Sequence, residues 1–329
     1  MSKFSALQVR ESAAGGFEQV IVQREIDDLP VGELLIRVKY SSLNYKDALS
    51  ASGNRGVTKN FPHTPGIDAA GVVEASSVAE FSVGDEVIVT GYDLGMNTSG
   101  GFAQYIRIPA SWALKRPKGL SLREAMVLGT AGLTAALCVD KLEQSGLTQD
   151  AGTVLVTGAT GGVGSVAVAL LTTLGYRVAA STGKAEQGDY LKALGAQQIV
   201  LRSELLDGTD KPMLKEQWAG AVDCVGGDIL FNVVKSLSYG SSVACCGLTA
   251  GVGFKGSVLP FILRGVNLLG VDSVELPLVV KASMWDKLSL QWKVNLEALV
   301  SEVTLEQLPA AIAQVLAGKQ VGRVLVKLT

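Results

Sequence analysis

A glycine-rich stretch near the middle of the chain has the residue types that bind phosphate. Residues 153–164 read Thr-Val-Leu-Val-Thr-Gly-Ala-Thr-Gly-Gly-Val-Gly. The first of these are typical of a buried parallel strand, and the apolar residues from Ser165 onward are typical of a helix. Glycines at this junction allow a sharp turn, close approach of a phosphate and tight helix packing. The pyrophosphate of a dinucleotide is therefore expected at the helix N-terminus, on Gly161, Gly162, Val163 and Gly164. A βα turn without a ligand is the alternative.

The residues after the next expected strand indicate which dinucleotide would bind. An NAD site usually has an Asp or Glu there, which holds the ribose hydroxyl. Here Val178-Ala-Ala-Ser leads into Thr182, Gly183 and Lys184, with no acid at the turn. A hydroxyl, a glycine and a cation, with Arg202 after the following strand, favour charge-assisted hydrogen bonds to a 2′-phosphate. We predict NADPH as the cofactor, with solvated surface charge as the alternative for the two cations.

Two sequence patterns divide the chain. Up to about residue 110, short alternating segments with Gly and Pro corners predict a partly barrel-like β domain; they include Ser5–Arg10, Glu18–Ile26 and Glu33–Ser42. After a helix start at Ser121, with Glu124 completing a capping box, strand and helix patterns alternate. The fold class expected is α/β, with a doubly wound parallel sheet in the second part. Its strands are expected at 154–157, 177–180, 198–201, 220–224, 242–246 and 267–271.

The last part of the chain is expected to return to the first domain. Trp285–Leu299 and Leu305–Ala317 have helical patterns, and Arg323–Leu328 has that of a final strand. The domains expected are therefore 1–125 with 275–329, and 126–274 for the nucleotide.

Composition narrows the class of protein. The net charge of −2 gives no electrostatic reason to expect nucleic acid or an anionic membrane. The N-terminus has no signal-peptide core, and no uninterrupted apolar run reaches transmembrane length, so we expect a soluble cytoplasmic protein. The four cysteines form no C-x-x-C pair and are interpreted as buried, reduced thiols.

Several stretches resemble the medium-chain dehydrogenase/reductase superfamily over essentially the whole chain. They are Ser41–Leu49, Pro65–Val73, Gly129–Ala135, Thr157–Ser165 and Pro260–Val274. The sequence is most similar to the zinc-free quinone oxidoreductase branch that includes bacterial acrylyl-CoA reductases. The resemblance implies a GroES-like catalytic domain beside a Rossmann domain. It also implies a nicotinamide end lined by Leu248, Ile262 and Ser273, with Thr130 as a further candidate whose alternative role is to cap a helix. These residues are expected to follow strand ends, where doubly wound sheets bind ligands. A CoA substrate carries phosphates and needs cations at the cleft mouth, and Arg323 is a candidate to serve the cofactor or CoA there.

Departures from the zinc-dependent members indicate that no metal is bound. Those members have a Cys in the first stretch and Gly-His-Glu in the second, whereas this chain has Asn44-Tyr45 and Gly66-Ile67-Asp68. A catalytic zinc needs three protein ligands. The one histidine, His63, stands between prolines and is interpreted as a hydrogen-bonding residue of a loop.

Without a Lewis acid, the chemistry suits substrates already activated by conjugation. The leading expectation is NADPH-dependent reduction of a small 2-enoyl-CoA, acrylyl-CoA to propionyl-CoA. Tyr45 is the best polar candidate to donate to the developing enolate, although packing against the nicotinamide explains it equally well. Lys46 and Asp47 are expected to pair with each other. The alternatives are an NADPH:quinone oxidoreductase and an NADPH-binding protein with little catalysis. The resemblance also implies a homodimer formed by pairing edge strands of the cofactor domain, and Asn267–Val274 is the segment expected to pair, because an apolar sheet edge must be covered.

Overall fold

The computed structural model describes residues 3–295 and 297–329 and divides into two compact units. The first unit consists of Met1–Thr130, Val274–Ser289 and Leu299–Thr329, and the second of Ala131–Ser273 and Leu290–Ala298. The first boundary falls at Thr130 rather than the expected residue 125, within the helical span α2 (Leu122–Gln144). Gly129 lies inside that span with φ 53° and ψ −156°, a conformation outside the helical range, so two helices meet there at a kink.

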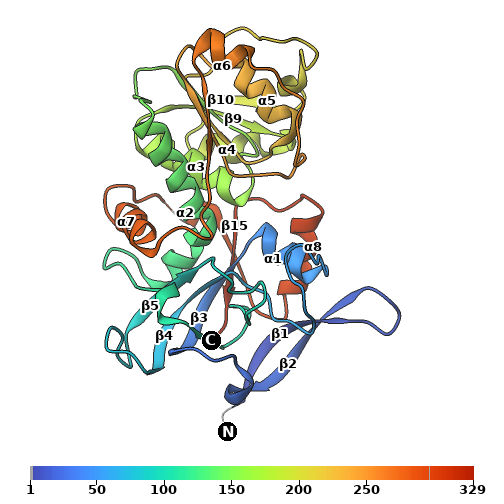
Figure 1. Ribbon diagram of the computed structural model, residues 1–329, viewed down its shortest axis with the longest axis vertical. Helices are drawn as coiled ribbons and strands as arrows, with labels where there is room; N and C mark the ends of the chain where they lie inside the picture. The colour runs from blue at the N-terminus through green and yellow to red at the C-terminus, as the bar shows by residue number, and fades with distance from the viewer. Residues whose placement is uncertain (1–2, 296) are drawn as a thin grey trace. The chain divides into compact units, whose positions relative to one another are not determined.

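A seven-stranded open sheet forms the centre of the first unit (Figure 1). Its strands run in the order β14 (Val300–Val303), β15 (Arg323–Lys327), β3 (Leu34–Leu43), β4 (Asp68–Ser76), β5 (Glu86–Thr90) and β7 (Ala113–Lys115), and β6 (Tyr105–Ile108) pairs with β3. Only β14 and β15 run parallel to each other in this sheet. A separate hairpin consists of β1 (Lys3–Glu11) and β2 (Phe17–Glu25). The strand-rich first domain and the return of the C-terminus are thus confirmed.

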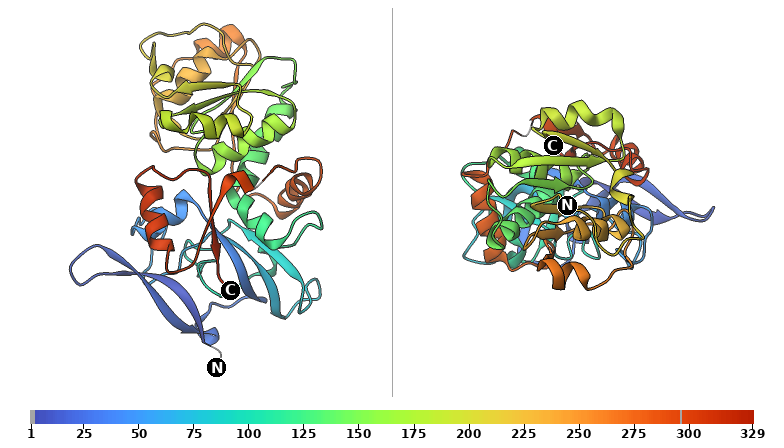
Figure 2. Two further views of the ribbon diagram at one scale, coloured as in Figure 1. Left: turned by 180° about the vertical axis from the view of Figure 1, so that it is seen from behind. Right: turned by 90° about the horizontal axis from the view of Figure 1, so that it is seen from above.

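Helices of the first unit are short. They are α1 (Tyr45–Ala51), the first part of α2, α7 (Leu278–Ser289) and α8 (Leu308–Leu316). In both side views α8 lies beside α1 (Figures 1 and 2). The helix expected over Trp285–Leu299 is wrong in both bounds. The helix begins after Pro277, whose carbonyl accepts from Lys281 N, and ends at Ser289, whose hydroxyl donates to Asp286 O. A serine that bonds its own helix competes with the next turn.

The second unit contains a six-stranded parallel sheet. The strands lie in the order β10 (Gln198–Leu201), β9 (Arg177–Thr182), β8 (Thr153–Val156), β11 (Gly220–Asp223), β12 (Ser242–Cys245) and β13 (Asn267–Gly270). In sequence order this is 3-2-1-4-5-6, the strand order of a doubly wound dinucleotide fold. The prediction of a Rossmann sheet is confirmed, with strand ends within a few residues of those expected.

The helices of the second unit connect these strands. They are the second part of α2, α3 (Gly162–Thr173), α4 (Gly188–Ala193), α5 (Gly227–Ser236) and α6 (Leu259–Arg264). In the described part of the chain, α2 is the one helix long and apolar enough to span a membrane by length and composition. The apolar window of α2 is 94% buried within the protein, as is usual for a core helix.

Candidate functional site

The glycine-rich turn has the geometry expected of a phosphate-binding junction. Gly158 follows β8 with φ 59°, a left-handed conformation that favours glycine. Gly161 is the N-cap of α3, so Gly162, Val163 and Gly164 form the first turn of that helix. A Cβ on Gly164 would stand 2.3 Å from Gly158 O, so only glycine lets the helix pack this closely. The backbone therefore presents the N-terminus of a twelve-residue helix at the end of β8.

A buried carboxylate, Asp223, holds this turn in place. Asp223 accepts hydrogen bonds from Thr157 Oγ1 (2.7 Å) and Gly226 N (2.8 Å). Burial raises the pKa of Asp223 to about 6, and its hydrogen-bond donors oppose that rise. Sequence reasoning did not single out Asp223, although an acid at the end of an apolar strand is a visible signal. Its contacts tie the ends of β8 and β11 together, which fixes the turn between β8 and α3.

The predicted 2′-phosphate residues lie together at the ends of β9 and β10. Arg202 N donates to Thr182 O (2.9 Å), and Lys184 N donates to Thr182 Oγ1 (3.0 Å). The Arg202 guanidinium lies 2.6 Å from the point where a Cβ on Gly183 would stand, so a side chain there would displace it. Partial burial, together with the charge of Arg202, lowers the pKa of Lys184. The structure thus brings two cations and a hydroxyl to one edge of the sheet.

The residues expected at the nicotinamide end are more dispersed. Leu248 follows β12 as expected and is 51% exposed. Ile262 is 68% exposed but lies within α6, so the expectation that it follows a strand end is wrong. Ser273 is buried, and its hydroxyl lies 2.7 Å from that of Thr134. That hydrogen bond ties the segment after β13 to α2.

In the first unit, Tyr45 is the first residue of α1 and is 40% exposed. The start of α1 is set by Asp47, which accepts from Asn44 N (2.8 Å) and from Ile67 N (2.8 Å). The expected Lys46–Asp47 pair is therefore wrong, because Asp47 is fully buried in a capping box. Burial, and next the charge of Asp68, raises the pKa of Asp47 to about 7.

Asp68 is the centre of a buried hydrogen-bond network around this helix start. Its Oδ2 accepts from Ser42 Oγ (2.5 Å), Asn44 Nδ2 (2.8 Å) and Thr130 N (2.9 Å). Its Oδ1 accepts from the hydroxyl of Thr130 (2.5 Å). Asp68 thus fixes two of the predicted site segments at once, the residue before Tyr45 and the side chain of Thr130.

Arg323 supplies a positive charge to the same network. Its side chain is only 2% exposed, and it donates to Val127 O (2.9 Å) and Leu43 O (3.3 Å). The sequence suggested a cation at a cleft mouth, but β15 lies between β14 and β3, so Arg323 is interior. Burial lowers the pKa of Arg323, and the charges of Asp68 and Asp47 oppose that effect. In this structure it neutralises buried carboxylates.

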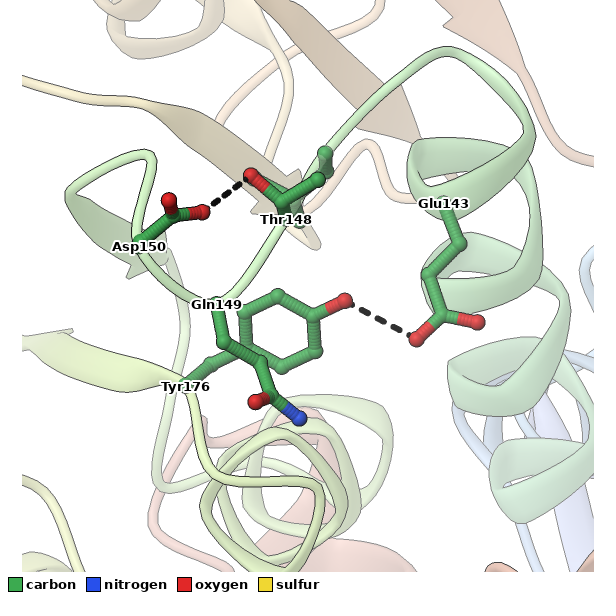
Figure 3. Close-up of a pocket in the computed structure, with 6 residues that line it drawn as sticks. Glu143, Thr148, Gln149, Asp150 and Tyr176 are labelled. Atoms are coloured by element: carbon green, nitrogen blue, oxygen red, sulfur yellow. Dashed lines mark hydrogen bonds between the residues drawn. The ribbon is translucent and has the colours of Figure 1, made fainter.

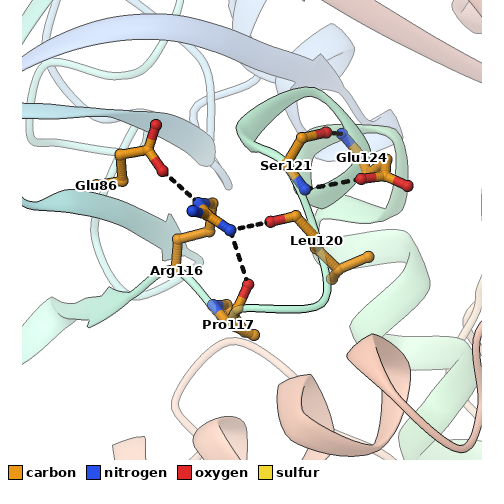
Figure 4. Close-up of polar contacts among 6 residues, drawn as sticks. All are labelled: Glu86, Arg116, Pro117, Leu120, Ser121 and Glu124. Atoms are coloured by element: carbon orange, nitrogen blue, oxygen red, sulfur yellow. Dashed lines mark hydrogen bonds and ion pairs between the residues drawn. The ribbon is translucent and has the colours of Figure 1, made fainter.

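Two surface hollows lie apart from these residues. One, of about 450 Å³, is in the second unit, where Tyr176 Oη donates to Glu143 Oε1 (2.9 Å) (Figure 3). The other, of about 480 Å³, is in the first unit, where Arg116 pairs with Glu86 (Figure 4). Figure 4 also shows the predicted capping box, in which Ser121 N donates to Glu124 Oε2 (2.7 Å) and Glu124 N to Ser121 Oγ (3.1 Å). Neither hollow includes a predicted site residue.

Metal-ligating side chains do not gather in the described part of the chain: no group of three or more His, Cys, Asp or Glu residues there could hold an ion. His63 is buried, and its Nε2 lies 2.9 Å from Gly95 O. The interpretation of His63 as a loop hydrogen-bonding residue is confirmed.

Comparison with known proteins agrees with both units. The family model "Alcohol dehydrogenase GroES-like domain" matches residues 30–118, and "Zinc-binding dehydrogenase" matches residues 162–289. Acrylyl-CoA reductase AcuI of Ruegeria pomeroyi is 46% identical over 98% of both chains. The chain belongs to the quinone oxidoreductase branch of the medium-chain dehydrogenase/reductase superfamily.

Solved structures of two family members are similar over their whole length. The yhdH oxidoreductase of Salmonella enterica, in complex with NADP, has a TM-score of 0.96 at 42% identity, covering 99% of this chain and 100% of its own. Bacillus subtilis protein yhfP, with NAD bound, has a TM-score of 0.96 at 47% identity and full coverage of both chains. This protein is therefore an oxidoreductase of that family.

Proposed function

We propose that this protein uses NADPH to reduce the activated C=C bond of a small 2-enoyl-CoA, acrylyl-CoA giving propionyl-CoA. The observation that carries the proposal is the 46% identity to acrylyl-CoA reductase AcuI over 98% of both chains. The charge pattern of the second unit supports the choice of NADPH, and the polar residues of the first unit suit a substrate that needs no metal.

NADPH is proposed as the cofactor because the residues at the ends of β9 and β10 fit a 2′-phosphate. Lys184 and Arg202 supply two positive charges, and Thr182 supplies a hydroxyl. Gly183 and Lys184, the two residues directly after β9, are not carboxylates, whereas an NAD enzyme would hold the ribose there with an acid; Glu186 follows two residues later. The first turn of α3 suits the pyrophosphate. A relative with NAD bound makes the comparison of NADPH with NADH an essential test.

Bound NADPH would supply a hydride to Cβ of the enoyl thioester. The chain must then stabilise the negative charge that develops on the thioester oxygen. We propose Tyr45 as the donor, because it begins α1 and its phenol is part-exposed rather than buried in the core. Asp47 and Asp68 are fully buried, and their hydrogen bonds to Asn44 orient the start of this helix. A pre-oriented donor loses no free energy to reorganisation when the charge forms.

Zinc independence is part of the proposal. The positions where zinc-dependent relatives have Cys and His are occupied here by Asn44 and Ile67, neither of which ligates zinc through a thiolate or imidazole. The Asn44 amide instead donates to Asp68 Oδ2 (2.8 Å). A conjugated thioester is already polarised toward hydride addition, so it suits such a site.

The test follows NADPH oxidation with acrylyl-CoA, crotonyl-CoA and a simple benzoquinone side by side, each repeated with NADH. The proposal requires kcat/KM for acrylyl-CoA to exceed that for the quinone by at least about a hundredfold, or about 2.7 kcal/mol of transition-state stabilisation. A preference for the quinone would instead support the alternative, an NADPH:quinone oxidoreductase. A Bacillus subtilis relative is 47% identical over 99% of both chains and is named provisionally as a quinone oxidoreductase, which supports that alternative.

We also propose a homodimer in the cytoplasm. β13 is the outermost strand of the second unit's sheet, and Leu268 on it is 36% exposed. An unpaired edge with an exposed apolar side chain is a template for pairing with a second copy. Light scattering at micromolar concentration tests this, and a monomer mass would contradict it.

A further inference from the structure

A cluster of thiols in the second unit has no part in the reaction proposed above. Cys224 directly follows β11, Cys246 directly follows β12, and their Sγ atoms lie 4.0 Å apart. Cys138, on α2, is fully buried and lies within hydrogen-bonding reach of Cys246. The four cysteines of the chain are all free thiols, so the close pair is reduced.

Strand register explains why Cys224 and Cys246 meet. In the parallel pair β11–β12, Asp223 stands opposite Cys245, so the next residues of the two strands, Cys224 and Cys246, also stand opposite each other. Cys246 N donates to Asp223 O (2.9 Å), which keeps the strand ends together. Successive side chains point to opposite faces, so Cys245 is directed away from the pair, with its Sγ 4.0 Å from Asp223 Oδ2. The neighbouring cysteine is therefore a natural control.

The two sulfurs of the pair differ in character. Cys246 Sγ donates to Asp223 O (3.3 Å) and to Cys224 Sγ (4.0 Å). Its sulfur contacts with Cys138 and Cys224 lower the pKa of the Cys246 thiol and raise the pKa of the other two thiols. The thiolate is the nucleophilic form of cysteine. Cys224 and Cys246 are part-buried, whereas Cys138 is inaccessible to solvent. Cys246 is thus the sulfur best placed to attack a small electrophile.

We propose that Cys246 is a modification site for hydrogen peroxide, with Cys224 as its resolving thiol. The Cys246 thiolate attacks one peroxide oxygen, an S–O bond forms, the O–O bond breaks, and the leaving hydroxide takes a proton to become water. Cys224 sulfur then attacks Cys246 sulfur, the S–S bond forms, the S–O bond breaks, and a second water leaves. Two thiols are oxidised to one disulfide, and one peroxide is reduced to two waters.

The disulfide would disturb the backbone that carries the proposed cofactor site. A disulfide brings its sulfurs to about 2.05 Å, so the two side chains must move together from their present separation of 4.0 Å between sulfurs. The two backbones are packed closely there, because a Cβ on Gly247 would stand 1.9 Å from Cys224 O. Gly158 of the glycine-rich turn is also adjacent, since its Cβ position lies 3.4 Å from Cys224 Cβ. The predicted loss of cofactor affinity rests on the proposed function, whereas the oxidation itself does not.

The experiment treats the reduced, full-length protein with hydrogen peroxide and analyses it by intact mass and peptide mapping. The expected product has lost two hydrogen atoms and links the peptides of Cys224 and Cys246. Cys224→Ser should stop at a sulfenic acid on Cys246 that dimedone traps, and Cys246→Ser should form no such disulfide. Cys245→Ser is the matched control and should oxidise like the wild type. An unchanged mass, or a disulfide that survives Cys246→Ser, would overturn the proposal.

The consequence is measured separately by titrating NADPH into reduced and oxidised protein. At least a tenfold loss of affinity, reversed by dithiothreitol, is expected. If the disulfide forms and NADPH affinity is unchanged, the modification site stands and its link to the cofactor is refuted. If the reduced protein binds no NADPH, the proposed function is refuted. The mass measurement still tests separately whether Cys224 and Cys246 form a disulfide.

Discussion

The buried charge of Arg323 is the clearest target for a stability measurement. Replacing it by leucine keeps much of the side-chain volume and removes the cation from a network that holds two buried carboxylates, Asp47 and Asp68. The change also leaves Val127 O and Leu43 O without their present donor. We predict that Arg323→Leu is strongly destabilising.

The magnitude follows from the burial of the group. Arg323 Nη2 and Asp68 Oδ2 lie 3.1 and 2.6 Å from the point where a Cβ on Gly129 would stand, so the two charges are near neighbours. Removing one partner of a buried charge pair costs about 3–5 kcal/mol, because the other charge is left uncompensated. The same removal at an exposed pair costs about 0–1 kcal/mol. Arg10→Leu is the matched control, because Arg10 pairs with Glu18 on the surface of the same unit.

The pH dependence gives an additional signature. Burial raises the folded-state pKa of Asp47 to about 7, above its ordinary 3.8, so the folded protein retains a proton that the unfolded chain releases. The stability that Asp47 contributes is full below about pH 4 and declines as the pH rises through about 7. Above about pH 7, Asp47 is ionised as well, so removing Arg323 leaves more buried negative charge without a partner. The loss of stability in Arg323→Leu is therefore larger above about pH 7 than below it.

Urea unfolding of the wild type, Arg323→Leu and Arg10→Leu at pH 5.5 and pH 8 measures both effects. We expect Arg323→Leu to lose about 3–5 kcal/mol of unfolding free energy, with the larger loss at pH 8, and the control to lose about 0–1 kcal/mol. Equal losses for the two variants, or a loss that is smaller at pH 8, would refute the reasoning from buried charge.

The remaining predictions concern the kink of α2, cofactor binding, the proposed hydrogen-bond donor Tyr45 and the dimer. Gly129→Ala should destabilise the protein by about 3 kcal/mol in thermal or urea unfolding, because its φ is positive and a Cβ would stand 2.4 Å from a serine hydroxyl; unchanged stability would contradict this. Lys184→Ala and Arg202→Ala should each weaken NADPH binding about 10- to 150-fold and NADH binding little, as measured by titration, since a charge-assisted hydrogen bond contributes about 1.5–3 kcal/mol. Equal effects on both nucleotides would remove the 2′-phosphate assignment. Tyr45→Phe should lower kcat about a hundredfold if the phenol stabilises the enolate, whereas an unchanged kcat would leave it a packing role. Leu268→Arg should shift light scattering from a dimer mass to a monomer mass, and a wild-type monomer would end the dimer proposal.

The second unit could be predicted well because its signals are local. The strands are short runs rich in apolar residues, and a polar residue or a glycine directly follows β8, β9 and β10. The strands at Gln198–Leu201 and Arg177–Thr182 were therefore found near their observed bounds. The grouping of Thr182 with Lys184 and Arg202 followed from one topological rule, that strand ends of a parallel sheet share an edge. Whether these residues bind a 2′-phosphate stays a prediction.

The network of the first unit could not be predicted in the same way. Asp47, Asp68 and Arg323 are charged residues that sequence reasoning places at the surface, and their burial depends on strands far apart in the chain. The capping position of Asp47, three residues after Asn44, was a local signal that was interpreted instead as a pair with Lys46. The helix expected at Trp285–Leu299 failed for a related reason, because helical periodicity does not show where a serine ends the helix.

Reduction of acrylyl-CoA with NADPH deuterated at the transferred position of C4 tests the central claim most directly. We expect the deuterium on C3 of propionyl-CoA, and a separate reaction in D2O should label C2. Turnover without deuterium at C3, or no propionyl-CoA at all from a protein that oxidises NADPH with quinones, would contradict an enoyl-thioester reductase.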